Sequence, residues 1–551
     1  MRKSLSAFVL LLCCLSLGAQ QHTFYSQFRR SDSLQVAELW TPTEVRPGEV
    51  THEIGHHGPA VENQFMALRF YYDGRGAIDV YNKSGLIDNE LGRWHWYPSD
   101  KAIAEEGAGC DEYFVGKTLG IGGVLLWDGE KAVRLDATAG RRSVVGRKGN
   151  SVYMEMTAYG VEYMEEKVDI AVRVDVYDGS RWANVSAREI NGRKVQFVTG
   201  VNYHPGSIVQ QGRGYIAVWG AHPANIVQKP RPLGAGLRYQ ARKFSEPEDT
   251  GNMIRLVSAP ASSISTSIVS ASLSDTELGD AVKFLEYVAD RHLSLRVISY
   301  NIRYGKGKDG PNAWDLRKTA TLEMIAREAP DVFGVQEALD FQEQYILDNC
   351  PDFRSVGVGR DDGAGKGERM SVFYNRKSLK LLKWGTYWLS ETPDKPSKGW
   401  DAQCFRTATW VLLKDRRSGQ KFYYVNTHLD HKGVEARKNG LSLIVDRIDA
   451  MNPEGLPMLL GGDFNVLPDD PCLNSLEGRM KSSRLSAQES DLHATFNGWG
   501  RAGDVSDGVK GIIDYIYWKD FGACVHYRVL TGDYGAPYIS DHYPICTDFL
   551  F

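Results

Sequence analysis

The chain has 551 residues, more than one hydrophobic core usually supports, so we expect two or more domains. Its 42% hydrophobic and 24% charged residues exclude a disordered or collagen-like chain. The formal net charge of −4 excludes a protein that holds nucleic acid mainly through a basic surface.

The N-terminus has the order of a secretory signal peptide. Arg2 and Lys3 precede an apolar stretch over residues 5–17, and two small residues follow it. We expect residues 1–20 to be a signal peptide that is cleaved near residues 18–20, which predicts a secreted or periplasmic protein. No later apolar run approaches the roughly 20 residues of a membrane helix, so we expect no membrane span.

Residues 22–273 have the pattern of a β-rich domain. The segments 168–177 and 264–272 alternate between apolar and polar residues, wholly or in part, with the period of two that strands require. Asp-Gly pairs such as Asp178-Gly179 supply turn signals between such segments. These observations predict a mainly antiparallel β-sandwich.

The next segment, residues 274–293, has helical spacing and predicts a linker helix. Ser274 and Glu277 form a capping-box pattern at its start, which places the first turn there. From residue 294 to residue 551, strand patterns alternate with helical patterns. We therefore expect an α/β layered domain over 294–551.

Polar clusters stand at or just after the apolar strands of the second domain, where loops present functional groups on a rigid scaffold. Carboxylate and amide oxygens suit a hard cation, Mg²⁺ or Mn²⁺. Two histidines beside such an ion suit attack by an activated water on phosphorus. The clusters are Asn301, Gln336-Glu337, Asn426-Thr-His428, Gly462-Asp463-Phe-Asn465, Asp514 and Ser540-Asp541-His542.

In their spacing and order these motifs resemble the endonuclease/exonuclease/phosphatase superfamily, which includes deoxyribonuclease I, sphingomyelinases and inositol polyphosphate 5-phosphatases. The resemblance covers nearly all of residues 294–551 and implies a four-layer α/β/β/α sandwich of the deoxyribonuclease I-like type. The motifs that carry it are Ser299-Tyr-Asn-Ile302, Val335-Gln-Glu337, Asn426-Thr-His428, Gly461-Gly-Asp-Phe-Asn465, Ile513-Asp514-Tyr and Ser540-Asp-His542.

The resemblance also implies a role for each polar residue. Glu337 is expected to be the principal metal ligand, with Asn301 and Asp541 as further ligands. Asp463 is expected to orient or deprotonate the attacking water, and Asn465 to hold that water and a transition-state oxygen.

Four further residues complete the expected site. His542 is expected to contact phosphate or take the water proton, while Asp514 fixes its tautomer. His428 is expected to donate a hydrogen bond to the phosphorane, a bond that strengthens as negative charge develops. Arg406 is expected to contact the substrate phosphate.

The first domain resembles an uncharacterised family of exported bacterial proteins linked to polysaccharide use, through the segments 58–63, 77–81 and 94–98. The resemblance implies a carbohydrate-related role and a mutarotase-like super-sandwich. Aromatic residues with polar neighbours suit sugar rings, although tryptophans in a sandwich more often belong to its core. The candidate residues are Glu62, Asn63, Trp94, Trp96, Tyr97, Trp182 and His204.

Together the two halves predict an exported, metal-dependent phosphoesterase. We expect in-line attack of water on a phosphodiester in nucleic acid, phospholipid or phosphorylated glycan. Nucleic acid would need a local basic groove, for which Lys306, Lys308 and Arg360 are candidates, although such residues more often belong to a solvated surface. The alternative function is a carbohydrate-binding or carbohydrate-active protein whose C-terminal domain is accessory.

Overall fold

The computed structural model describes residues 22–29, 34–43, 54–83, 88–94, 98–109, 111–224, 230–501 and 511–551. The expected signal peptide lies outside the described residues. The chain divides between Gly279 and Asp280 into two compact units, which are described separately below. Within the described residues, no helix is long and apolar enough to cross a membrane.

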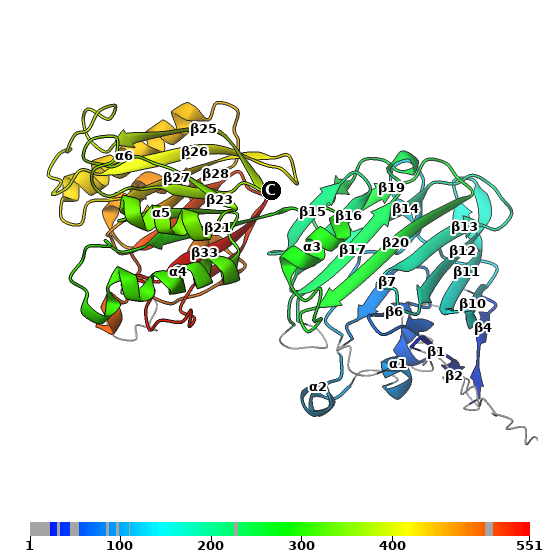
Figure 1. Ribbon diagram of the computed structural model, residues 1–551. Helices are drawn as coiled ribbons and strands as arrows, with labels where there is room; N and C mark the ends of the chain where they lie inside the picture. Colours follow the sequence, from blue (N-terminus) through cyan, green and yellow to red (C-terminus); the bar gives the residue numbers. More distant parts are fainter. Residues whose placement is uncertain are drawn as a thin grey trace, which may run out of the picture. The chain divides into compact units, whose positions relative to one another are not determined.

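The N-terminal unit is built from antiparallel sheets (Figure 1). Its largest sheet has the strand order β15-β16-β17-β20-β13-β12-β11-β10-β4, and a second has the order β18-β19-β14-β8-β9. Two smaller sheets have the orders β1-β5-β6-β7 and β2-β3. Strand β14 of the second sheet contacts β16 and β17 of the largest one. The predicted β-rich, largely antiparallel architecture is confirmed.

The strands of this unit are β1 (Phe24–Ser26), β2 (Phe28–Arg29), β3 (Gln35–Val36), β4 (Glu38–Thr41), β5 (Ala60–Glu62), β6 (Ala67–Phe70), β7 (Ile78–Tyr81), β8 (Leu125–Trp127), β9 (Ala132–Val133), β10 (Arg141–Lys148), β11 (Ser151–Tyr163), β12 (Glu166–Tyr177), β13 (Ala183–Glu189), β14 (Phe197–Asn202), β15 (Ile208–Gly212), β16 (Tyr215–Gly220), β17 (Leu233–Tyr239), β18 (Glu248–Asp249), β19 (Met253–Val257) and β20 (Ser263–Ser272). Its helices are α1 (Glu90–Arg93), α2 (Asp100–Glu106) and the 3₁₀ turns η1 (Gly55–His57) and η2 (Ala241–Lys243).

The helix expected over 274–293 is shorter than the sequence pattern predicts. Helix α3 (Ala281–Ala289) begins after Asp280, whose carboxylate accepts from the backbone N–H of Lys283. The predicted cap at Ser274 is wrong, because its hydroxyl lies 3.0 Å from that of Ser272 instead. The carboxylate of Asp275 accepts hydrogen bonds from the backbone N–H groups of Glu277 and Leu278, in a turn that precedes the helix.

The C-terminal unit contains two sheets. Their strand orders are β23-β24-β22-β21-β33-β32-β30 and β25-β26-β27-β28-β31-β29. The strands are β21 (Ser294–Asn301), β22 (Val332–Gln336), β23 (Phe353–Val356), β24 (Val372–Asn375), β25 (Leu379–Trp388), β26 (Thr407–Asp415), β27 (Lys421–His428), β28 (Met458–Asp463), β29 (Lys481–Ser482), β30 (Glu489–Ser490), β31 (Asp514–Lys519), β32 (Ala523–Val529) and β33 (Ile545–Leu550). Besides α3, the helices are α4 (Trp314–Glu328), α5 (Asp340–Asn349), α6 (Val434–Met451), α7 (Ser483–Ser486), η3 (Gly310–Asn312), η4 (Pro471–Leu476) and η5 (Gly498–Gly500).

The two sheets of this unit pack face to face through an apolar core that includes Val297 and Leu459. Helices α4 and α5 cover the outer face of the first sheet, where Met324 joins the same apolar cluster as Tyr300. Helix α6 covers the outer face of the second sheet, where Ile444 joins the cluster of Val425. The predicted α/β/β/α layering is confirmed.

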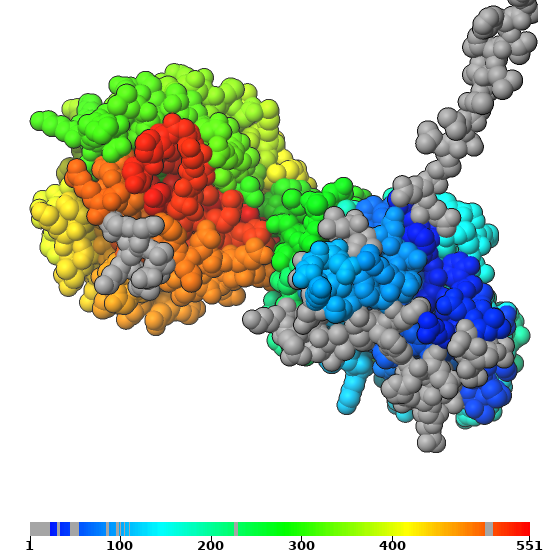
Figure 2. Space-filling view, turned by 90° about the horizontal axis from the view of Figure 1, so that it is seen from below, coloured from blue at the N-terminus to red at the C-terminus, as the bar shows by residue number. Residues whose placement is uncertain are grey.

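The strand registers bring the polar motifs to one edge of both sheets. Strands β21 and β22 are parallel and end at Asn301 and just before Glu337. Strands β27 and β28 are parallel, and His428 is directly opposite Asp463. Strand β33, which follows the last motif, pairs with both β21 and β32. Figure 2 shows red surface from the C-terminal part of the chain between green and orange surface.

Candidate active site

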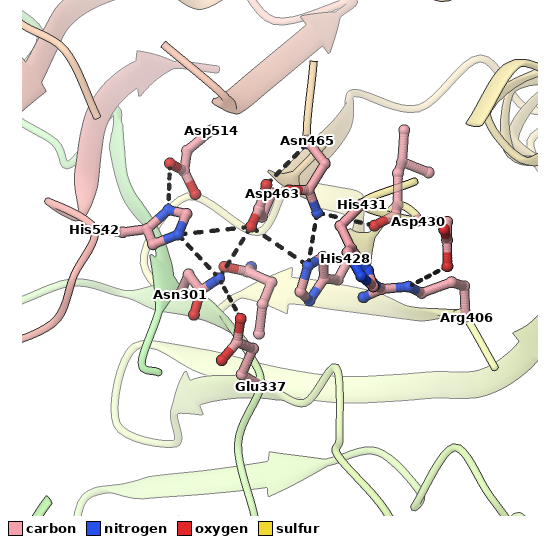
Figure 3. A network of polar contacts seen from close by, with 12 residues as sticks. Asn301, Glu337, Arg406, His428, Asp430, His431, Asp463, Asn465, Asp514 and His542 are labelled. Atoms are coloured by element: carbon pink, nitrogen blue, oxygen red, sulfur yellow. Dashed lines mark hydrogen bonds and ion pairs between the residues drawn. The ribbon is translucent and has the colours of Figure 1, made fainter. Parts of the chain in front are cut away.

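A single side-chain atom links the three most important predicted residues. The Nδ2 atom of Asn301 lies 3.2 Å from Oε1 of Glu337, 3.0 Å from Oδ2 of Asp463 and 3.5 Å from Nε2 of His542 (Figure 3). Asn301 and Asp463 end strands of different sheets, β21 and β28. The structure therefore gathers motifs more than 200 residues apart into one centre.

Asp463 is buried in the middle of this centre. Its Oδ1 accepts from the backbone N–H of Asn465 at 2.9 Å, and its Oδ2 lies 3.4 Å from Nε2 of His428. Burial and the nearby negative charge of Asp514 raise the pKa of Asp463 to about 7. A carboxylate with that pKa can exchange a proton at neutral pH, which is the property that a general base needs.

His542 lies between two carboxylates. Its Nδ1 is 2.9 Å from Oδ2 of Asp514, and its Nε2 is 3.8 Å from Oδ2 of Asp463. Burial alone would lower the pKa of His542, but the charge and hydrogen bond of Asp514 raise it to about 10. The ring therefore carries a positive charge at neutral pH, with one N–H directed towards the centre of the site.

His428 has a different protonation state from His542. Its Nε2 accepts from Nδ2 of Asn465 at 2.9 Å, and the same Nδ2 donates to the Leu429 carbonyl at 3.1 Å. The neutral tautomer that fits this contact carries its proton on Nδ1, which has no hydrogen-bond partner among the described residues. Burial and the charge of Arg406 hold the pKa of His428 well below its usual range, so the ring is neutral. The expected donation by His428 to phosphate stays a prediction.

Two further carboxylates form an acidic end of the site. Oε2 of Glu337 accepts from the backbone N–H of Tyr304 at 2.8 Å, and Glu337 itself has a left-handed backbone with φ of 61°. Burial raises the pKa of Asp541, and the negative charge of Glu337 acts in the same direction. Two crowded carboxylates with hard oxygen donors fit a divalent cation such as Mg²⁺.

The metal-ligand role of Asn301 stays a prediction, and hydrogen bonds fix its amide beside the two carboxylates. Its Oδ1 accepts from the backbone N–H of Arg303 at 3.0 Å, which fixes the orientation of the amide. The amide nitrogen, not the oxygen, therefore faces Glu337 and Asp463. In this orientation Asn301 holds the two carboxylates in place through hydrogen bonds.

Arg303 was missed by the motif analysis. Its Nε lies 3.6 Å from Oδ2 of Asp541 and its Nη1 lies 3.9 Å from Oε2 of Glu337. Two hydrogen bonds of 3.0 and 3.2 Å to Asp309 hold the guanidinium there. The only sequence signal was its place two residues after Asn301, at the end of a strand that carries a site residue.

The predicted phosphate contact, Arg406, lies at the opposite end, close enough to His428 to lower its pKa (Figure 3). Its Nη2 is 3.0 Å from Nδ1 of His431, and its Nε is 3.4 Å from Oδ2 of Asp430. Asp430 accepts from four backbone N–H groups and is thereby fixed. Asp430 and His431 were also missed, because neither belongs to a motif.

The candidate basic groove is only partly assembled. Arg360 pairs with Glu368 at 2.6 Å, and its charge also lowers the pKa of His428. Lys306 and Lys308 are exposed. Of the three, Arg360 lies within electrostatic range of the site, whereas the lysines have the exposure of a solvated surface.

The carbohydrate candidates of the N-terminal unit do not form one exposed surface. Glu62 is fully buried and pairs with Lys83 at 2.8 Å. Asn63 is also buried and donates to the carbonyl groups of Tyr177 and Ser180. Both residues are therefore structural, which corrects their assignment as sugar contacts.

Two other candidates, Trp182 and His204, make ring contacts with residues other than Glu62 and Asn63. The Trp182 ring lies 4.6 Å from the Arg238 guanidinium carbon, and the His204 ring lies 4.4 Å from that of His222. Trp96 and Tyr97 lie outside the described residues.

Comparison with known families decides the assignment. Residues 298–542 match the endonuclease/exonuclease/phosphatase family, and residues 16–296 match a domain of unknown function (DUF4861). The chain belongs to both families, one in each half. Membership of the first supports phosphoester hydrolysis by the C-terminal domain.

Several known proteins are similar to this C-terminal domain. The mannosyl-6-phosphatase of Bacteroides thetaiotaomicron is 32% identical, and the match covers 47% of this chain and all of that one, with a TM-score of 0.45. An endonuclease/exonuclease/phosphatase of Bacteroides vulgatus is also 32% identical, covering 47% of this chain and 99% of that one, with a TM-score of 0.44. Nocturnin of Drosophila melanogaster is 26% identical over 215 residues, which are 36% of this chain and 31% of that protein.

Proposed function

We propose that the C-terminal domain hydrolyses a phosphodiester by direct attack of water on phosphorus, and that it requires Mg²⁺ or Mn²⁺. The observation that carries this proposal is the convergence of Glu337, Asp463 and His542 on the amide of Asn301. The three residues supply an anionic ligand, a proton acceptor and a cationic donor within one centre. Such a set can complete the reaction without a covalent enzyme intermediate.

Asp463 is the proposed acceptor of the proton that the attacking water loses. Its pKa of about 7 allows it to be ionised before attack and protonated after it. Two donors, the backbone N–H of Asn465 and the amide of Asn301, fix the direction of the carboxylate. A fixed carboxylate can orient water on one side of the phosphorus atom, as in-line displacement requires.

His542 is the proposed donor to the phosphoryl oxygens. Asp514 holds its Nδ1 side and keeps the ring cationic, so the Nε2 proton is available for a charge-assisted hydrogen bond. Such bonds strengthen as charge develops in the transition state. Glu337 and Asp541 would hold the divalent ion, which supplies Lewis-acid polarisation of a phosphoryl oxygen when bound.

Arg406 is proposed to contact the substrate phosphate from the other end of the site. Its side chain is buried, and its Nη1 has no hydrogen-bond partner among the described residues. Buried donors of this kind usually have a partner, and an anionic substrate oxygen is the proposed one. Asp430 and His431 hold the guanidinium and act as positioning residues.

We also propose that the protein is exported, on the basis of the basic, apolar and small residues at its N-terminus. The substrate would then be a phosphoester outside the cytoplasm. A glycan-related role of the N-terminal unit is a second proposal. It involves only the aromatic candidates, because Glu62 and Asn63 have structural roles.

The test is hydrolysis of bis-p-nitrophenyl phosphate by the full chain, with Mg²⁺ or Mn²⁺ and with chelator. We expect metal-dependent activity that Glu337→Gln abolishes and that Glu477→Gln, an exposed control, preserves. A panel of DNA, RNA, phospholipid, inositol phosphate, phosphorylated glycan and mannose 6-phosphate then identifies the substrate class. Absence of hydrolysis of every phosphoester with either ion would contradict the proposal.

A further inference from the structure

The acidic end of the site already contains a positive charge. Arg303 places its guanidinium 3.6 Å from a carboxylate oxygen of Asp541 and 3.9 Å from one of Glu337. These distances fit ion pairs but exceed good hydrogen bonds, so the guanidinium lies over both carboxylates without being fully bonded to either. A cation beside two proposed metal ligands neutralises part of their negative charge, as a bound metal ion would.

The position of Arg303 is fixed by several contacts. Asp309, which is 9% exposed, receives two hydrogen bonds from the guanidinium. The backbone of Arg303 has φ of 63°, a region that residues other than glycine rarely adopt. Its N–H donates to Asn301, and its carbonyl accepts from Gln342 and Arg317. A disfavoured backbone that so many contacts hold is typical of a functional site.

The summed charge of the groups at this end favours the binding of one divalent ion over two. Glu337, Asp541 and Asp309 contribute three negative charges, and Arg303 contributes one positive charge. Arg317 adds a second positive charge, since it is 1% exposed and its hydrogen bonds go to carbonyl oxygens rather than to a carboxylate. One divalent ion therefore brings the group from one negative to one positive charge, and a second would leave three uncompensated positive charges.

We propose that Arg303, held by Asp309, is a built-in cation that weakens divalent-ion binding at Glu337 and Asp541 and limits it to one ion. This inference rests on the proposed function, because it takes those two carboxylates as the ligands. The Arg303 side chain is one-third exposed, so solvent screens part of its charge. We therefore expect its removal to tighten binding about tenfold, rather than by several orders of magnitude.

The experiment is calorimetric titration of the full chain with Mn²⁺. The wild type is expected to bind one ion, and Arg303→Gln to bind it about tenfold more tightly. Arg303→Lys retains the charge and should stay within about threefold of the wild type. Asp309→Asn, which releases the guanidinium, should give an intermediate affinity. Arg354→Gln is the matched control and should change nothing, because it removes an exposed arginine whose guanidinium donates to the carbonyl groups of Pro351 and Phe353.

The outcomes separate this inference from the proposed function. Unchanged or weaker binding by Arg303→Gln, with wild-type binding lost in Glu337→Gln, would overturn the role of Arg303 and leave the proposed metal site in place. Two ions in the wild type would also overturn it. If the wild type binds no Mn²⁺ at all, both the inference and the metal requirement fail. Circular dichroism of each variant shows that a changed affinity belongs to folded protein.

Discussion

Two buried charged clusters, one in each unit, differ in how their charges are arranged. In the N-terminal unit, Glu62 is matched by Lys83, and two backbone N–H groups also donate to its carboxylate. In the C-terminal unit, two carboxylates share each nearby cation. Asp463 and Asp514 lie on either side of His542. Asp541 and Glu337 both lie beside Arg303. A matched buried pair lowers stability strongly only when one partner is removed, whereas crowded like charges lower stability unless a cation, a ligand or a proton compensates them. The second arrangement therefore indicates a site.

The largest effect is expected from the matched pair. Lys83→Met leaves the carboxylate of Glu62 buried without its partner, which should cost about 3–5 kcal/mol of unfolding free energy. Urea unfolding followed by circular dichroism measures this loss. Lys101→Met, which breaks an exposed pair with Glu105, is the control and should change stability far less. Equal losses in both variants would mean that the Glu62–Lys83 pair is not a structural one.

A change at the crowded carboxylates should lower activity without lowering stability. Asp463→Asn is expected to lower kcat/KM by about 10²–10³-fold or more, because it removes the proposed proton acceptor. The same change relieves repulsion with Asp514, so the melting temperature should stay equal or rise. Kinetics with bis-p-nitrophenyl phosphate and a thermal melt on the same sample measure both. A large loss of stability together with activity would indicate a structural role instead.

A matched pair within the C-terminal unit but away from the site gives a pH-dependent comparison. Although burial alone would raise it, the hydrogen bonds from His526 and Arg296 lower the pKa of Asp548 to about 2. A lowered carboxyl pKa stabilises the fold above the unfolded value near 4, and this contribution is lost as pH falls from about 5 to 2. The expected contribution is about 2.5 kcal/mol. Urea unfolding of the wild type and Asp548→Asn at pH 5 and pH 2.5 should show a smaller acid loss in the variant.

The smallest effect is expected at the exposed lysines. The double change Lys306→Gln and Lys308→Gln should alter hydrolysis of bis-p-nitrophenyl phosphate by less than about twofold, since solvent screens both charges. Cleavage rates on DNA at low and high salt provide the more sensitive measurement. A tenfold loss on DNA alone, removed by salt, would show that these lysines form a nucleic-acid groove after all.

Local patterns predicted an α/β layered C-terminal domain with polar residues at its strand ends, and the family resemblance supplied the four-layer architecture and the expected roles of those residues. Alternating strands with a polar residue at each end place Asn301, Asp463 and His542 at one sheet edge once the strands pair in the observed order. The helix start at Ser274 was wrong because capping depends on which of several nearby acceptors takes the free N–H groups. Asp280 and Asp275 were equally available to the pattern.

What the sequence did not predict are properties that depend on orientation and burial. The amide of Asn301 turns its nitrogen inward because the N–H of Arg303 occupies its oxygen. His428 is neutral and accepts a hydrogen bond because Asn465 is held by a backbone carbonyl. Glu62 belonged to a plausible sugar-binding set until its burial beside Lys83 was known. None of these contacts has a spacing that a motif could reveal.

The most direct test of the proposed catalytic centre compares phosphodiester hydrolysis by the full-length wild type and Glu337→Gln, each with Mn²⁺ and with chelator. The wild type should be active only with the ion, and Glu337→Gln should be inactive in both conditions while remaining folded. Hydrolysis that persists in chelator, or a Glu337→Gln variant with wild-type activity, would contradict a metal-dependent centre built on these residues.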